Sequence, residues 1–160
     1  MHSGSVPAMH ANAARRVSWV GASRARCGKK PLGSAGDTVW QLHADVNAWP
    51  AWQTDITAAH IDGAFQPGAS FEWTSYGFTV VSTIYAVAER ARVLWGGTAD
   101  GITGVHEWVF SMTPAGVRVT TDESFAGGPV EADVTGMQSA LDSSLVAWLA
   151  HLKAAAESKA

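Results

Sequence analysis

The sequence predicts an α+β fold in which a curved antiparallel sheet of six to seven strands wraps around one long C-terminal helix. Six strand-like runs separated by turn residues fill residues 56–125, at a spacing typical of consecutive hairpins. Apolar residues then recur every three or four positions across 134–152, which indicates an amphipathic helix. Two short helices are expected between a first strand and these hairpins. The length of 160 residues suits a single core.

The elements before the hairpins depend on a few residues. Val17 and Trp19 share one face at period-two spacing, so a first strand is expected across about residues 15–24. Asp37 is a suitable N-cap for the first short helix. Asn47 and then Pro50 break this helix, because proline has no backbone N–H and disfavours helix at the preceding residue. The two short helices are therefore expected to meet at or near Trp49, Pro50 and Trp52.

The six strands and the final helix follow from turn residues and periodicity. The strands are expected at Ile56–Ile61, Ser70–Ser75, Phe78–Val87, Arg92–Thr98, Ile102–Met112 and Val117–Phe125. The helix that follows them is expected to span about 25 residues, or ~38 Å, which is long enough to cross a whole sheet.

Charge is divided unevenly along the chain. Residues 1–34 carry six basic side chains and no acidic one, and we expect them to form a basic leader that can contain the first strand. Residues 35–160 carry 5 basic and 14 acidic side chains, a net charge of −9, and are expected to form the single folded domain. A body this acidic repels phosphate backbones, so nucleic acid is not an expected partner.

Cysteine use and hydropathy bear on the compartment. Cys27 is the single cysteine, which excludes an intramolecular disulfide and a cysteine-based zinc site and fits a reducing compartment. No stretch approaches the ~20 apolar residues of a membrane-spanning helix. We therefore expect a cytoplasmic protein without membrane insertion, either monomer or homodimer.

Metal and cofactor motifs are missing from the sequence. The histidines are scattered without ligand spacing, at positions His2, His10, His43, His60, His106 and His151. There is also no glycine-rich phosphate loop and no serine nucleophile elbow. The expectation is that the protein uses neither a metal nor a nucleotide cofactor.

One hairpin offers candidate acid–base chemistry. If Met112 faces Val117 across the turn, the antiparallel ladder pairs His106 with Glu123 on the inner face of the sheet. A carboxylate beside an imidazole can orient it and stabilise its charged form, so both are candidate catalytic residues, together with Tyr85. A structural polar contact is the alternative for the His106 and Glu123 pair, and it is the more frequent one.

Aromatic side chains could line a pocket for a flat apolar ligand. The candidate ligand-binding residues are Trp73, Tyr76, Trp95, Trp108, Thr121, Met137 and Leu141. Ordinary core packing is the alternative for each of them. Phe71 and Phe78 are expected to be plain core, and Trp49 and Trp52 to pack the short helices against the sheet.

Two passages carry a resemblance to a known superfamily. The run Asp45, Val46, Trp49, Pro50 and Trp52 resembles the Asp…Trp-Pro-x-Trp passage of START-like, or SRPBCC, proteins, and Gly116 to Thr120 is similar to their last hairpin. The branch it looks most like is that of the polyketide cyclases and dehydrases, over roughly residues 35–157. The resemblance implies a helix-grip fold with a cavity between the sheet and the last helix.

Three functions remain open from the resemblance. The first is binding of a hydrophobic small molecule, polyketide-, lipid- or aromatic-like, in that cavity. The second is a polyketide cyclase or dehydratase that uses acid–base catalysis there. The third is an interaction module like the co-chaperones of the superfamily, which is disfavoured because the outward positions of the strands look solvated.

Overall fold

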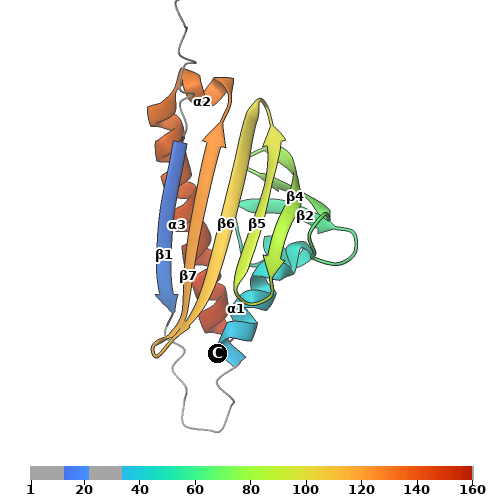
Figure 1. The fold of residues 1–160 in the computed structure, drawn as a ribbon, viewed down its shortest axis with the longest axis vertical. Helices are drawn as coiled ribbons and strands as arrows, with labels where there is room; N and C mark the ends of the chain where they lie inside the picture. Colours follow the sequence, from blue (N-terminus) through green and yellow to red (C-terminus); the bar gives the residue numbers. More distant parts are fainter. Residues whose placement is uncertain (1–12, 22–33, 160) are drawn as a thin grey trace, which may run out of the picture.

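The computed structural model describes residues 13–21 and 34–159, and it contains a seven-stranded antiparallel sheet with helices on one face (Figure 1). The strand order is β1-β7-β6-β5-β4-β3-β2, so consecutive strands from β2 to β7 are neighbours. The strands are β1 Ala13–Gly21, β2 Ile56–Ile61, β3 Ser70–Ser75, β4 Phe78–Ala88, β5 Arg92–Ala99, β6 Ile102–Thr113 and β7 Gly116–Ala126.

Four helical segments accompany the sheet. They are α1 Ser34–Ala44, the 3-10 helix η1 Val46–Ala51, α2 Gly128–Ala132 and α3 Val134–Ser158. The side chain of Asp133 caps α3 by accepting a hydrogen bond from the backbone N–H of Gly136 at 2.9 Å. Figure 1 shows α3 along the sheet behind β1 and β7, with its C-terminal end beside α1, and these elements are in contact.

The predicted fold class is confirmed, with small differences at the ends of elements. The final helix has the predicted 25 residues, but the short helix α2 precedes it and was not expected. The first strand is Ala13–Gly21 rather than 15–24, and α1 begins at Ser34, before Asp37. The division of the chain at residue 34 stays a prediction.

Two tight turns set the register of the central hairpins. Tyr76 and Gly77 join β3 to β4 with φ values of 50° and 82°, and Asp100 and Gly101 join β5 to β6 with 49° and 78°. Two successive residues with positive φ are typical of the two-residue turns that match the twist of antiparallel strands. The result is a meander that presents alternate side chains to the helices, with irregular pairing between Ile56 and Ala58 and between Ile84 and Ala86.

The core lies between the helices and the inner face of the sheet. Phe71 is buried there, as predicted, whereas Phe78 is 56% exposed and the prediction of a core position for it is wrong. Phe78 pairs with Ser75 in the last rung of the β3–β4 ladder, beside the tight turn. Met112 pairs with Val117 as predicted, but its side chain is 58% exposed. It lies one residue before the end of β6, next to the hairpin turn.

Candidate functional site

An aromatic cluster joins the sheet to the helices. Its seven ring side chains come from both layers: His43, Trp49, Trp73, Trp95, His106, Trp108 and Trp148. The ring centroid of His106 lies 4.6 Å from that of Trp95 and 5.0 Å from that of Trp108. Trp148 of α3 lies 5.5 Å from Trp108 of β6, so helix and sheet meet here through direct ring contact.

The contact between Trp148 and Trp108 lies where a cavity between the sheet and the last helix was expected. The sequence predicts an apolar cavity between the sheet and the last helix, but around Trp148 the described side chains fill that space. A ligand that enters at this place has to part the rings of the aromatic cluster.

The proton positions on His106 follow from its neighbours. Thr121 Oγ1 lies 3.0 Å from the carbonyl oxygen of Glu107, which can only accept, so the single hydroxyl proton of Thr121 is donated there. His106 Nε2 lies 2.6 Å from the same hydroxyl oxygen and must therefore donate to it. The other ring nitrogen, Nδ1, carries a lone pair.

Glu123 faces that lone pair from β7. Its Oε1 lies 3.5 Å from His106 Nδ1, and the predicted pairing of the two residues across the hairpin is confirmed. Burial raises the pKa of Glu123 to about 8, and burial followed by the nearby His43 lowers the pKa of His106 well below its usual value. Near pH 7 both groups are therefore uncharged, with the proton on Glu123.

His43 is a part of this site that sequence reasoning did not single out. It projects from α1 into the aromatic cluster, and burial lowers its pKa to about 3. Its position between Leu42 and the Trp49 passage, on the apolar face of a helix, was the available signal. A neutral imidazole there contributes one donor and one acceptor.

Several buried ring nitrogens in the described part of the chain have no hydrogen-bond partner. Five belong to the aromatic cluster: Nδ1 and Nε2 of His43, Nε1 of Trp95, Nδ1 of His106 and Nε1 of Trp108. Each unpartnered buried polar group costs about 1–3 kcal/mol. The site is therefore lined mainly by the apolar faces of rings, but its ring nitrogens could still form hydrogen bonds with a ligand.

The other predicted ligand-binding residues are divided between two places. Trp73 belongs to the aromatic cluster and donates from Nε1 to Ser82 Oγ at 3.1 Å. Met137 and Leu141 lie apart from it, in a second apolar group around Val130 near α2. The sequence predicts that they form the cavity wall opposite the aromatic residues, whereas the described contacts place them in this separate group.

The two tyrosines lie outside the interior. Tyr85 is 51% exposed on the outer face of the sheet, where its ring covers Gly96, so it does not share a site with His106 and Glu123. Tyr76 is 65% exposed in the β3–β4 turn. Its pKa is raised by partial burial, then by a hydrogen bond with Asp55 and by the charge of that carboxylate. The expectation that either tyrosine lines the pocket is wrong.

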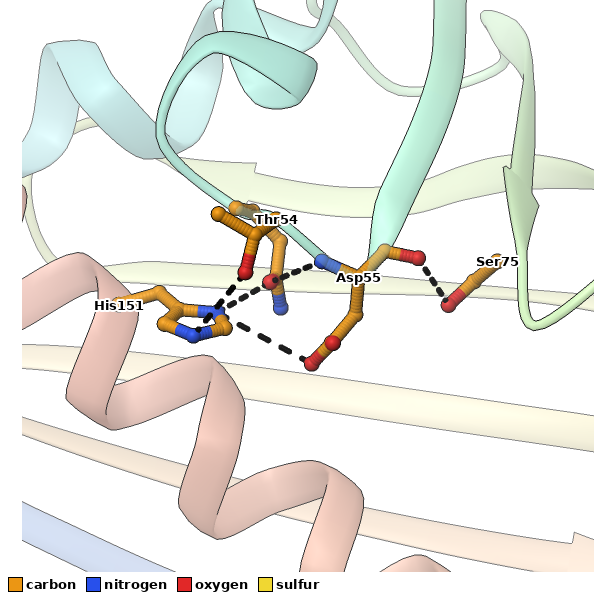
Figure 2. Close-up of polar contacts among 5 residues, drawn as sticks. Thr54, Asp55, Ser75 and His151 are labelled. Atoms are coloured by element: carbon orange, nitrogen blue, oxygen red, sulfur yellow. Dashed lines mark hydrogen bonds and ion pairs between the residues drawn. The ribbon is translucent and has the colours of Figure 1, made fainter.

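A surface groove lies apart from the aromatic cluster, and none of the seven cluster residues lines it. It has a volume of about 790 Å³ and runs between α1, η1 and the last turns of α3, and Thr54 and His151 are among its lining residues. Figure 2 shows Thr54, Asp55 and His151 converging at the corner between η1 and β2, and His151 also contacts Gln53 there. No feature of the sequence brought His151 close to residues almost a hundred positions earlier.

The described residues contain neither a group of metal ligands nor a membrane-spanning helix. Within residues 13–21 and 34–159, no three histidine, cysteine, aspartate or glutamate side chains come together as metal ligands would. In the same ranges, no helix is long and apolar enough to cross a membrane.

Comparisons with known proteins agree with this architecture. The chain matches the family described as polyketide cyclase / dehydrase and lipid transport over residues 34–157. A hypothetical protein from Helicobacter pylori is 20% identical, with a TM-score of 0.70 over 96% of this chain and 98% of that chain. A START superfamily protein from Mycobacterium smegmatis is 12% identical, with a TM-score of 0.67 over 93% and 99%.

A third solved structure has an enzymatic name. The Zhui aromatase/cyclase from Streptomyces is 17% identical, with a TM-score of 0.67 over 91% of this chain and 93% of that chain. Identities this low show a shared fold and nothing finer. The comparison with curated proteins finds no match.

Proposed function

Because the chain belongs to the polyketide cyclase / dehydrase and lipid transport family, we propose that its aromatic cluster binds an apolar small molecule that carries hydrogen-bond acceptor oxygens. The family suggests that a small molecule is bound, and the side chains of the interior suggest which kind of molecule it is. A flat molecule that parts the rings of this cluster gains contact area on Trp95 and Trp108, the two indoles that pack against His106.

The unpartnered ring nitrogens carry this proposal. The indole N–H groups of Trp95 and Trp108 are donors that accept nothing, so a matching ligand must present acceptors such as carbonyl oxygens. Packing alone would be served equally well by phenylalanine at these positions. A ligand carbonyl that takes up one of these N–H groups removes the cost of leaving it unpaired.

A matched pair of ligands tests the proposal. Fluorenone and fluorene have the same three-ring skeleton, but only fluorenone has a carbonyl oxygen. We expect quenching of tryptophan fluorescence to show tighter binding of fluorenone, by about fivefold for each hydrogen bond formed, or about 1 kcal/mol. Native mass spectrometry of the complex gives the stoichiometry.

Two variants connect the preference to the site. Trp108→Phe keeps a ring but removes the N–H, and it should reduce the preference for fluorenone toward unity. Trp52→Phe is the matched control, because Trp52 Nε1 is also buried without a partner but the ring lies at the edge of the cluster, beside Trp148. Equal affinity for the two ligands in the parent protein would exclude the proposal.

A second candidate function rests on the His106 and Glu123 pair. In a dehydration, His106 Nδ1 would accept the proton next to a ketone while Glu123 donates its proton to the departing hydroxyl, which leaves as water. The 3.5 Å contact allows the proton to return from His106 to Glu123 afterwards. A carboxyl group with a pKa of about 8 is suited to donate near neutrality.

Product analysis distinguishes the two functions. Incubation with a β-hydroxy ketone that fits the aromatic cluster should yield the unsaturated ketone if the dehydratase function holds, and Glu123→Gln should abolish the product while binding persists. Recovery of unchanged compound at full occupancy would leave the binding function alone. For either function, we propose a cytoplasmic location and no metal or nucleotide cofactor.

A further inference from the structure

One corner of the surface groove contains a group of polar side chains that is separate from the aromatic cluster. Gln53, Thr54 and Asp55 lie between η1 and β2, and His151 of α3 contacts Gln53. Figure 2 shows the His151 ring beside Thr54 and Asp55. We call these four side chains the His151 cluster. Thr54 and His151 both line the groove of about 790 Å³, so a molecule lying in the groove would contact them.

The orientation of the His151 ring is determined by Gln53. The backbone N–H of Asp55 donates to Gln53 Oε1 at 3.1 Å, which identifies that atom as the amide oxygen. His151 Nδ1 contacts the same oxygen and must therefore donate to it. The Asp55 carboxylate lies on this side of the ring as well, with Oδ2 at 3.9 Å from Nδ1.

The opposite ring nitrogen is therefore a base. With the proton on Nδ1, neutral His151 has a lone pair on Nε2, and Thr54 Oγ1 lies 3.4 Å from it. A hydroxyl that faces an imidazole whose far side is held by a carboxylate and an amide oxygen is the arrangement that activates a nucleophile. Distances of this kind are often longer before a substrate binds.

We infer that the His151 cluster is a second reactive centre, in which Thr54 accepts an acyl group from an activated ester or thioester. Thr54 Oγ1 bonds to the carbonyl carbon while its proton passes to His151 Nε2. The bond from that carbon to the alcohol or thiol then breaks, and the leaving group takes the proton from His151. Water hydrolyses the resulting ester by the same route and regenerates Thr54.

The groove favours an apolar acyl group over a phosphoryl group. Its walls include the apolar side chains of Leu42, Trp52, Ala154 and Ala155, which can cover a hydrocarbon chain. Two aspartates, Asp37 and Asp45, and one lysine, Lys159, also line it, so the lining offers no cluster of cations that would hold a phosphate ester. The volume lies within the ~300–1,000 Å³ range of small-molecule sites.

Labelling with a p-nitrophenyl ester of a medium-chain acid tests the inference. We expect a burst of p-nitrophenolate close to one equivalent per protein, and an acyl adduct that peptide mass spectrometry assigns to Thr54. Thr54→Ala should lose the adduct, and Thr54→Ser should keep it. His151→Gln should slow acylation about 100-fold or more, the contribution typical of a general base.

Thr57→Ala is the matched control. Thr57 is an exposed threonine three residues away whose hydroxyl donates to a backbone carbonyl, that of Thr74, and has no histidine beside it. Its variant should label like the parent. The inference is overturned if the folded parent does not react, if the adduct lies on Ser158 or Lys159, or if His151→Gln and Thr54→Ser variants with unchanged melting temperatures fail to behave as stated.

Discussion

Glu123 Oε1 lies 3.5 Å from His106 Nδ1 inside the protein, and burial leaves both side chains uncharged near pH 7, with a proton on Glu123 and a lone pair on Nδ1. Thr121 holds the other end of the imidazole at 2.6 Å, so the ring cannot turn without losing a hydrogen bond. An uncharged acid beside an uncharged base is compatible with the apolar rings around it. The same burial makes the stability of the fold depend on pH.

Replacement of Glu123 should change how the stability of the fold depends on pH between about 4.5 and 8. Its pKa is about 8 in the folded protein and near 4.5 when unfolded, so the folded state holds the extra proton between these values and stability falls as pH rises through them. We expect urea unfolding from pH 6.5 to 8 to show a loss of up to about 1.4 kcal/mol per pH unit from this group. Glu123→Gln should remove that slope.

An exposed glutamate provides the comparison for this experiment. Glu72 lies on β3 with an exposed side chain, and Glu72→Gln should leave the slope of the parent intact. Parallel curves for the parent and Glu123→Gln would show that Glu123 is ionised near neutrality.

Replacement of His43 should change stability on the acidic side. Burial lowers its pKa to about 3, whereas the unfolded chain takes up a proton near pH 6.5, so stability falls as pH drops below 6.5. His43→Leu removes the two unpartnered nitrogens and should be more stable than the parent at pH 5. Unfolding of His60→Leu, at an exposed position on β2, serves as the control; an unchanged acid slope in His43→Leu would contradict the prediction.

Trp148 should hold α3 against the sheet. Its ring touches Trp49, Trp52 and Trp108, so Trp148→Ala leaves a large cavity and should cost about 3–5 kcal/mol in the free energy of unfolding. Val146 lies two residues earlier and is 56% exposed, so Val146→Ala should change stability by less than about 0.5 kcal/mol. Similar losses in the two variants would argue against this docking.

Two adjacent glycines before α3 should respond oppositely to alanine. Gly127 has a φ of 128°, and an added Cβ would lie 2.0 Å from the carbonyl oxygen of Gly101, so Gly127→Ala should cost about 2–4 kcal/mol. Nothing lies within 4 Å of a Cβ added at Gly128, in the first turn of α2. Thermal unfolding should show no loss for Gly128→Ala, and equal losses in the two variants would contradict the close approach of Gly127 to Gly101.

The hairpin that carries the interior pair could be predicted to the residue. The turn between β6 and β7 consists of Pro114 and Ala115, and once it is placed, alternation along both strands pairs His106 with Glu123. Period two also placed Trp108 and Thr121 on the inner face, where both are buried. These relationships connect residues less than twenty positions apart.

Tyr85 shows where the same reasoning fails. It alternates with the buried Ile84 and therefore faces outward, and the irregular pairing between Ile84 and Ala86 occurs at this position. Gly96 on the next strand leaves room for the ring, since an added Cβ would lie 3.0 Å from it. Treating aromatic residues as a class of pocket-lining side chains ignored this local geometry.

The sequence by itself determined the succession of the strands and of the long final helix, the register of the β6–β7 hairpin and the inner face of its two strands, because these depend on turn residues and on periodicity between near neighbours. The tertiary structure alone decided that His43 joins the aromatic cluster and that His151 meets Gln53 and Thr54. Contacts of that kind depend on how α1 and α3 pack on the sheet. Packing arises from the shapes of many side chains together, and no local pattern records it.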